Sequence, residues 1–489
     1  MGTVSLRRVN ARLVLPHPVE RAVVLPGSES WIAGLEAVGV HVTADPSAAQ
    51  LAVAPSRLVA EALATGAAML IVEGRGAGRT LRRAGFAVER LLPLPSVEEP
   101  DVLLPLDRPS VARYALSRSL LPSTRLKELR NRAVATGQGL EFAGRLRSLV
   151  TVGAREPGPP FLVAAAEGMG VSRGAGWFLA SGQGDRLSRG LFQLFPPGSH
   201  EPAWALKFAA VPGYAAPFER DQRGLELVAG VGGVAAARAP RLLGRFSAGG
   251  IEASLETAAV GSRLVSYLRS SAPLPARTGA VDAIAAWVVE VETETAGSEA
   301  LLADERHRLI RDVLPHWSFA GVAADLVERL PPVPAVLQHD DLGTWNLVID
   351  GGGDRFTVLD WEGARRFGFP VWDLWYFLAD AFAVLDGAVG VDAQEEHFAQ
   401  LFRGELPWSE RLFGWTRRAA EALALPATSV GPLAMLCWLH HGVSHLARAD
   451  AVELHAPGSR PAATRFERLA RRWLRDPLLG PAWPAWRQP

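Results

Sequence analysis

Between residues 22 and 95, short apolar runs alternate with segments of helical periodicity. The strand-like runs are residues 22–25, 40–43, 51–54 and 68–72. Strands that alternate with helices of this size predict a small parallel sheet, so we expect a Rossmann-like α/β domain over residues 1–115. Residues 26–30, which follow the first strand, contain one glycine, whereas close approach to a cofactor needs several. The domain is therefore expected to lack a cofactor.

The pattern changes twice along the rest of the chain. Residues 116–160 are arginine-rich and helical in pattern, and they predict a helical linker. Residues 161–259 consist of short runs separated by turns, which predict a small lobe of β-hairpins. Residues 260–489 mostly carry helical periodicity and predict a helical lobe.

Residues 336–362 hold the densest set of candidate catalytic groups. His339 and Asp341 follow a short apolar run, and Asn346 opens the next one. A glycine-rich turn and a return strand then lead to Asp360, so we expect Asn346 and Asp360 at the open end of a β-hairpin. Amide and carboxylate oxygens are suitable ligands for Mg²⁺, which keeps phosphates and waters as its other partners. The hairpin therefore predicts a magnesium site.

The spacing of His339, Asp341 and Asn346, with Asp360 after the hairpin, resembles the aminoglycoside phosphotransferase and choline kinase family. The resemblance covers about residues 170–450 and implies an α+β, two-lobed protein-kinase-like fold. It implies that Asp341 is the catalytic base and that His339 braces the catalytic loop. It also implies that Asn346 and Asp360 hold Mg²⁺.

Two further features bear on this resemblance. Asp340 departs from the family, which most often has glycine there. Lys207 is one of only two lysines among the 51 Lys and Arg residues, and it lies in a strand that follows a glycine-containing hairpin. A compact ammonium is not interchangeable with a guanidinium at a phosphate site, so Lys207 is the expected ligand of the nucleotide phosphates.

The family resemblance implies additional nucleotide-binding residues around this lysine. A glutamate of the next helix is expected to orient Lys207, and we prefer Glu226 to Glu219 because it lies closer to the apolar face. The glycine loop departs from the usual G-x-G-x-x-G pattern. The remaining candidates are three phosphate-capping residues and one in the strand that meets adenine, namely Ser181, Gly182, Gly184 and Glu256.

Composition limits the partners and the compartment. The formal net charge is zero, which indicates neither nucleic acid nor an anionic membrane as a partner. The single cysteine, Cys437, excludes an internal disulfide and fits a reducing compartment. No apolar segment approaches the roughly 20 residues of a membrane-spanning helix, and no secretory signal is recognisable. We expect a cytoplasmic protein.

The prediction is a phosphotransferase that uses ATP or GTP with Mg²⁺ and phosphorylates a hydroxyl group of a small molecule. One alternative is a nucleotide-binding pseudokinase or scaffold. Another is methyltransferase activity in the N-terminal domain, because residues 49–73 resemble part of a degenerate class I methyltransferase. The missing glycines count against this activity, and a partner-binding or specificity module is favoured over a catalyst. A di-metal phosphohydrolase that uses His440, His441 and His445 is disfavoured, because the dipeptide at residues 339–340 follows a strand and is not in a helix.

Overall fold

The computed structural model describes residues 7–119, 149–181, 189–209, 215–320, 325–350, 355–455, 465–476 and 483. The chain divides into two compact units. Unit 1 comprises residues 1–219 and 241–260, and unit 2 comprises residues 220–240 and 261–489. The candidate nucleotide lysine belongs to unit 1, and the hairpin of residues 347–358 belongs to unit 2.

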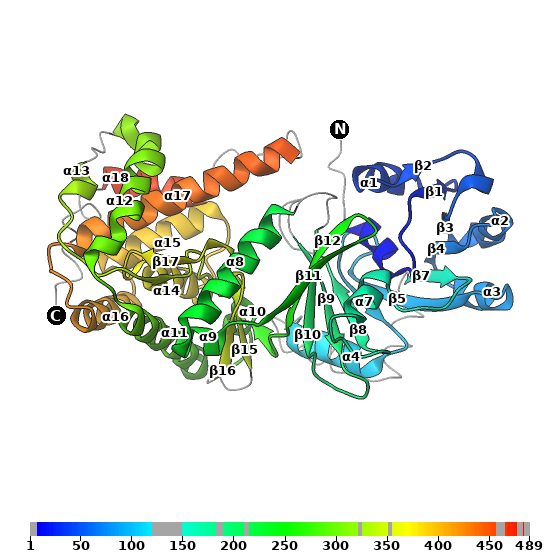
Figure 1. Ribbon diagram of the computed structural model, residues 1–489, viewed down its shortest axis with the longest axis horizontal. Coiled ribbons are helices and arrows are strands. Elements are labelled where there is room, and N and C mark those ends of the chain that lie inside the picture. The colour runs from blue at the N-terminus through cyan, green and yellow to red at the C-terminus, as the bar shows by residue number, and fades with distance from the viewer. Residues whose placement is uncertain are drawn as a thin grey trace. The chain divides into compact units, whose positions relative to one another are not determined.

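The described residues of unit 1 form a twelve-stranded sheet with the order β11-β12-β10-β9-β8-β6-β5-β7-β4-β3-β1-β2 (Figure 1). Its strands are β1 (Arg21–Val24), β2 (His41–Val42), β3 (Leu51–Pro55), β4 (Met69–Gly74), β5 (Ala87–Pro95), β6 (Pro100–Pro105), β7 (Leu149–Ala154), β8 (Gly176–Ala180), β9 (Gly190–Phe195), β10 (Trp204–Phe208), β11 (Leu242–Ala248) and β12 (Ile251–Thr257). The parallel strands expected in the N-terminal region are present, because β1 pairs in parallel with β2 and β3, and β3 with β4. The pairs on the other side of β4 are antiparallel.

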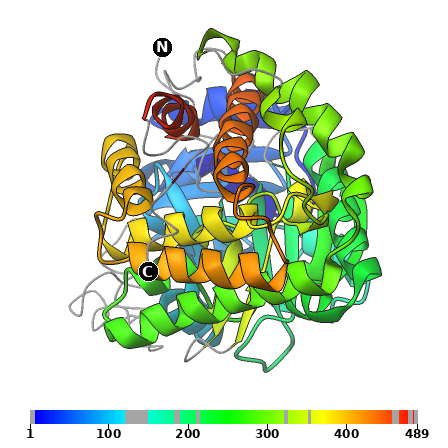
Figure 2. The same cartoon turned by 90° about the vertical axis from the view of Figure 1, so that its left-hand side faces the viewer.

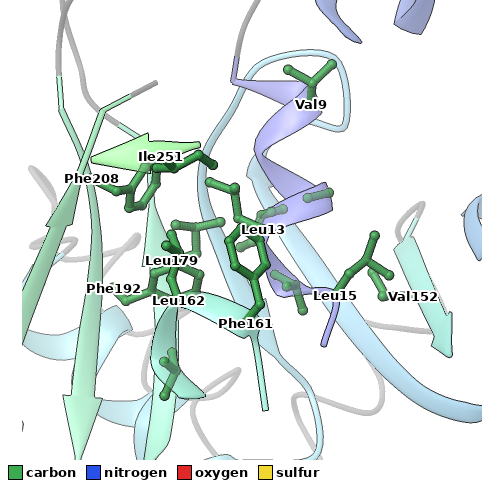
Figure 3. Packing of buried hydrophobic residues seen from close by; sticks show 14 of the residues in the cluster. Val9, Leu13, Leu15, Val152, Phe161, Leu162, Leu179, Phe192, Phe208 and Ile251 are labelled. Carbon is green, nitrogen blue, oxygen red and sulfur yellow. The ribbon is translucent and has the colours of Figure 1, made fainter. Parts of the chain in front are cut away.

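Short helices cover this sheet, and its core lies between them and the strands. The helices are η1 (Arg8–Val14), η2 (Glu29–Trp31), α1 (Ile32–Ala37), η3 (Pro46–Ala48), η4 (Ser56–Leu58), α2 (Val59–Ala64), α3 (Ala77–Arg83), α4 (Pro109–Tyr114), η5 (Ala115–Ser119) and α7 (Phe161–Glu167). Leu13 of η1 and Phe161 of α7 belong to the same buried cluster as Phe192 and Ile251 of the β-hairpins (Figure 3). Burial of this apolar surface ties the N-terminal segment to the hairpin strands.

One sheet continues across the predicted boundaries at residues 115 and 160. β6 pairs with β8, with Val102 opposite Ala180, so the N-terminal strands and the hairpin strands are hydrogen-bonded to one another. The predicted helical linker is wrong for residues 149–154, which form β7 between β4 and β5. All six residues of β7 are buried, which explains why this segment is a central strand. Residues 120–148 of that linker lie outside the described residues.

Unit 2 is mainly helical, with two small sheets. Its helices are most of α8 (Ala216–Val231), then α9 (Gly233–Arg238), α10 (Leu264–Leu268), α11 (Leu274–Thr295), η6 (Glu299–Leu302), α12 (Ala303–Arg308), η7 (Leu309–Val313), η8 (Leu314–Ala320), α13 (Asp325–Glu328), η9 (Thr344–Asn346), η10 (Trp361–Gly363), α14 (Trp372–Leu385), α15 (Val391–Arg403), α16 (Ser409–Ala422), α17 (Val430–His455) and α18 (Arg465–Arg475). Its strands are β13 (Ser262–Arg263), β14 (Val336–Gln338), β15 (Leu347–Asp350), β16 (Arg355–Val358) and β17 (Arg365–Gly368). β15 and β16 form a hairpin as expected.

Helix α14 is the centre of unit 2. It is apolar almost throughout and buried along nearly its whole length, and α11 and α16 run beside it (Figure 2). Three of its polar side chains, Asp373, Tyr376 and Asp380, are spaced three and four residues apart and therefore share one face of the helix. That face contacts residues 339–344, which belong to the predicted catalytic loop.

In the part of the chain that the structure describes, no helix is both long enough and apolar enough to cross a lipid bilayer.

Candidate active site

The β15–β16 hairpin brings Asn346 and Asp360 to one end, as predicted. Leu347 is opposite Val358, and the backbone N–H of Leu359 donates to the carbonyl oxygen of Asn346 at 2.7 Å. Asp360 follows directly, in the left-handed backbone region with φ of 66°. This conformation is uncommon for a residue with a Cβ atom, and such residues are frequent at functional sites.

Two donors hold the carboxylate of Asp341. Nδ2 of Asn346 donates to Oδ2 of Asp341 at 2.9 Å, and the hydroxyl of Tyr376 donates to Oδ1 at 2.8 Å. Asp341 is nevertheless exposed to solvent, so a substrate can reach it. Desolvation by the surrounding protein, together with the nearby carboxylates of Asp360 and Asp340, raises the pKa of Asp341. A carboxylate with a raised pKa is a stronger proton acceptor than an ordinary aspartate.

His339 supports the loop from beneath. Its Nε2–H donates to the carbonyl oxygen of Leu359 at 2.9 Å, and its Nδ1 accepts from the backbone N–H of Asp341 at 3.3 Å. The hydrogen-bond pattern therefore assigns a neutral imidazole with its proton on Nε2. The ring also packs on Trp361, with centroids 4.6 Å apart, and burial lowers the pKa of His339. With both nitrogens engaged, His339 is a structural brace.

Two buried aspartates of α14 anchor the loop backbone, and the sequence analysis assigned a role to neither. Asp373 accepts from the backbone N–H of His339 at 2.5 Å and from that of Asp340 at 2.9 Å. Asp380 accepts from the backbone N–H of Thr344 at 2.9 Å and from its hydroxyl at 2.6 Å. An aspartate is rarely buried without partners, so two of them within an apolar helix were the available sequence signal.

The oxygens at the hairpin end fit a Mg²⁺ ion. Nδ2 of Asn346 is directed at Asp341, which leaves Oδ1 as the atom of this amide that can serve as a ligand. Together with the carboxylate of Asp360 it forms an all-oxygen pair, and Mg²⁺ is usually held by one or two such groups plus phosphates. Among the described residues, no three His, Cys, Asp or Glu side chains converge on a metal position.

In unit 1, Lys207 lies in the middle of β10 and forms an ion pair with Glu256 of β12. Its Nζ is 2.8 Å from Oε1 of Glu256, whose side chain is 1% exposed. Residue 205 is opposite residue 256, so the two side chains are diagonal neighbours on one face of the sheet. The role of Glu226 in orienting the lysine stays a prediction: Glu226 belongs to unit 2, is exposed on α8, and accepts from Gln222 at 2.6 Å.

The remaining nucleotide candidates are placed as follows. Ser181 is buried, and its Oγ accepts from Nδ2 of Asn10 at 3.3 Å, so its hydroxyl is directed into the protein; its role as a phosphate cap stays a prediction. Gly182 and Gly184 lie outside the described residues. On α8 the buried acid is Asp221, and it is close enough to His339 to raise the pKa of the imidazole, against the larger effect of burial. Sequence spacing alone did not distinguish Asp221 from its neighbouring acids.

Comparison with protein families matches residues 191–418 to the phosphotransferase enzyme family. The match confirms the family resemblance carried by residues 336–362, and it implies a protein-kinase-like fold for this part of a mixed α and β chain. The Rossmann-like character of the N-terminal region remains a prediction. No curated protein matches the chain.

Proposed function

Residues 191–418 form a domain of the phosphotransferase enzyme family, and on this premise we propose that the protein transfers the γ-phosphate of ATP to a hydroxyl group of a small molecule. The observation that carries the proposal is the state of Asp341. Its carboxylate is oriented by Tyr376 and Asn346 and is exposed to solvent. These are the properties of a base that accepts a proton from an incoming hydroxyl group.

The roles of the other residues follow from the chemistry of their side chains. Oδ1 of Asn346 and the carboxylate of Asp360 would hold Mg²⁺, which supplies charge neutralisation at the transferred phosphate when it is bound. Lys207 binds the nucleotide phosphates, and its buried partner Glu256 forms an ion pair with the ammonium group. His339 and Asp373 keep the loop backbone in the conformation that presents Asp341.

The test is a thermal-shift titration with ATP in the presence of Mg²⁺ or of a chelator. Saturating nucleotide at about 100 times its dissociation constant stabilises a protein by about 2.7 kcal/mol, so we expect the melting temperature to rise by several degrees when Mg²⁺ is present. Asp360→Ala removes a metal ligand and should abolish the Mg²⁺-dependent rise. Asp350→Ala is the matched control, because Asp350 ends β15 on the same hairpin but forms an ion pair with Arg355 at 2.7 Å.

A second experiment separates transfer from binding. Asp341→Asn should keep the nucleotide-dependent rise and lose phosphate transfer from radiolabelled ATP to hydroxyl acceptors in a screen. GTP, tested in parallel, decides which nucleotide is used. A rise without transfer to any acceptor supports the pseudokinase alternative, and the absence of a rise with either nucleotide contradicts the proposal. In that case S-adenosylmethionine is the next ligand to test, on the N-terminal region.

A further inference from the structure

The backbone of the catalytic loop is strained at Asp340. Its φ of 72° lies in the left-handed region, where glycine is preferred because it has no Cβ atom. The loop also packs closely against Gly363, because a Cβ atom added to Gly363 would be 3.1 Å from the Cβ atom of Asp340. This position separates His339 from Asp341, so its conformation determines where the proposed base points. An aspartate there must be held by contacts made by its side chain.

A closed ring of buried and half-buried polar side chains provides those contacts. It runs through Asp340, Arg365, Glu305, Arg308 and His440, and back to Asp340. Nη2 of Arg365 donates to Oδ2 of Asp340 at 2.9 Å, and Nε2 of His440 donates to Oδ1 at 2.6 Å. Arg308 donates to both oxygens of Glu305, at 2.5 and 2.9 Å, and to Nδ1 of His440 at 3.1 Å. Arg365 closes the ring, 3.6 Å from Glu305.

The ring is balanced in charge and fixes the state of His440. Two arginines face two carboxylates, so the ring is neutral overall when His440 is uncharged. A guanidinium has no acceptor, so Nδ1 of His440 accepts from Arg308 and the single ring proton is on Nε2, directed at Asp340. Both nitrogens are thus used, which leaves none for a metal ion. The ring joins the loop to α12, β17 and α17.

His441, which follows His440 in α17, supports Asp341 of the loop. The imidazole of His441 packs on the ring of Tyr376, with centroids 4.3 Å apart and planes inclined by 34°. The hydroxyl of Tyr376 donates to Oδ1 of Asp341 at 2.8 Å. Adjacent histidines of one helix therefore act on adjacent aspartates of the loop, one directly and one through a tyrosine.

We propose that His440 and His441 are positioning residues for the catalytic loop: His440 holds Asp340 in a conformation that would otherwise require glycine, and His441 fixes Tyr376 against Asp341. The effect on the loop stands independently, whereas its consequence for catalysis rests on the proposed phosphotransferase function. A glycine at this position would adopt the positive φ without support, whereas Asp340 is supported by the ring of polar side chains.

Hydrogen exchange of the loop tests the first half of this proposal without any assumption about activity. His440→Phe should speed exchange in a peptide that covers residues 336–346 by about tenfold, the effect of losing one charge-assisted hydrogen bond. Glycine adopts positive φ freely, so in the Asp340→Gly background the same His440 substitution should change exchange less than about twofold. His397→Phe is the control: His397 is a buried histidine of α15 that pairs with Asp386 at 2.8 Å, outside the loop.

Turnover tests the catalytic consequence, with water as the acceptor and phosphate release from Mg²⁺-ATP as the readout. His440→Phe should lower kcat about tenfold and leave KM for ATP within about twofold, because the proposed nucleotide ligands are untouched. His441→Ala should do the same and should not add to the effect of Tyr376→Phe. His441→Phe keeps an aromatic ring against Tyr376 and should restore kcat.

The outcomes separate the two proposals. Equal effects of His440→Phe with and without Asp340→Gly, in exchange or in turnover, would show that the ring is only structural and would overturn the inference. Failure of His441→Phe to restore kcat would overturn the role of His441. A wild-type chain that neither binds nor hydrolyses nucleotide, but shows the expected coupling in exchange, would support the positioning role and reject the phosphotransferase proposal.

Discussion

Gly224→Ala in α8 is the substitution whose effect follows most directly from the geometry. A Cβ atom at this position would be 1.9 Å from the carbonyl oxygen of Trp361 and 2.6 Å from its carbonyl carbon. Real Cβ contacts do not fall below 3.0 Å, so α8 and the backbone after Asp360 must separate by roughly 1 Å. Trp361 cannot move aside easily, because it is buried, packs on His339, and donates from Nε1 to the carbonyl oxygen of Val358 at 2.9 Å.

The magnitude can be worked from these contacts. Overpacking of this kind costs about 1–3 kcal/mol, and the better helix propensity of alanine returns up to about 1 kcal/mol, so we expect a net loss of about 1–2 kcal/mol. Gly230→Ala, near the end of the same helix, is the matched control, because a Cβ atom there meets nothing within 4 Å. It should stabilise the protein by about 0.5 kcal/mol. The two alanine variants should therefore differ by about 2 kcal/mol.

The assay is urea denaturation followed by tryptophan fluorescence, together with calorimetry. At about 2–4 °C per kcal/mol for a unit of this size, the two variants should melt roughly 4–8 °C apart. Gly224→Ala should also weaken the Mg²⁺-dependent ATP shift, because the displaced backbone carries Asp360, whereas Gly230→Ala should keep it. If both variants were equally stable and bound nucleotide equally, the close packing of α8 on η10 would be refuted.

Three other substitutions test the anchors of the loop and of the lysine. Asp373→Ala leaves one buried and one half-buried backbone N–H group without their acceptor and should lower the free energy of unfolding by about 2–5 kcal/mol in urea denaturation. His441→Phe should flatten the dependence of stability on pH below pH 6.5, measured by denaturation between pH 5 and pH 8. Lys207→Met leaves Glu256 buried without this partner and should cost about 3 kcal/mol, and adding Glu256→Met should recover much of the loss.

The sign of the pH effect follows from burial. Desolvation lowers the pKa of His441 well below its usual value; His445, Arg365 and, when it is protonated, His440 add to this effect, and Asp340 opposes it. The folded state therefore excludes a proton that the unfolded chain binds below about pH 6.5, and stability falls as the pH drops through that value. Between the folded and the unfolded pKa, stability falls by at most about 1.4 kcal/mol per pH unit. Parallel pH profiles for wild type and His441→Phe would contradict this account.

Controls for the other two substitutions are available on the surface. Asp312→Ala removes an exposed aspartate that pairs with its neighbour Arg311, and it should change stability by less than about 0.5 kcal/mol. An effect of Asp373→Ala no larger than this would contradict the anchoring of the loop. If the substitution at Lys207 and the paired substitution with Glu256 were equally destabilising, the buried ion pair would not be the source of the cost.

The sequence by itself determined the features that depend on local spacing. The β15–β16 hairpin follows from two short apolar runs around a glycine-rich turn, and pairing within a hairpin necessarily brings Asn346 and Asp360 to the same end. The placement of Lys207 in a strand follows from local pattern in the same way. The family resemblance could be recognised for the same reason, since its motif is confined to a continuous segment.

Only the tertiary structure decided which distant groups meet. Glu256 pairs with Lys207 because β12 lies beside β10, whereas Glu226, the residue preferred from the sequence, is on an exposed face of its helix. The buried His440 meets the half-buried Asp340 across 100 residues. Hydrogen bonds within a loop or hairpin are set by chain connectivity, whereas the partner of a buried charge depends on which elements pack together. A buried charge must find some partner, but the sequence does not say which one.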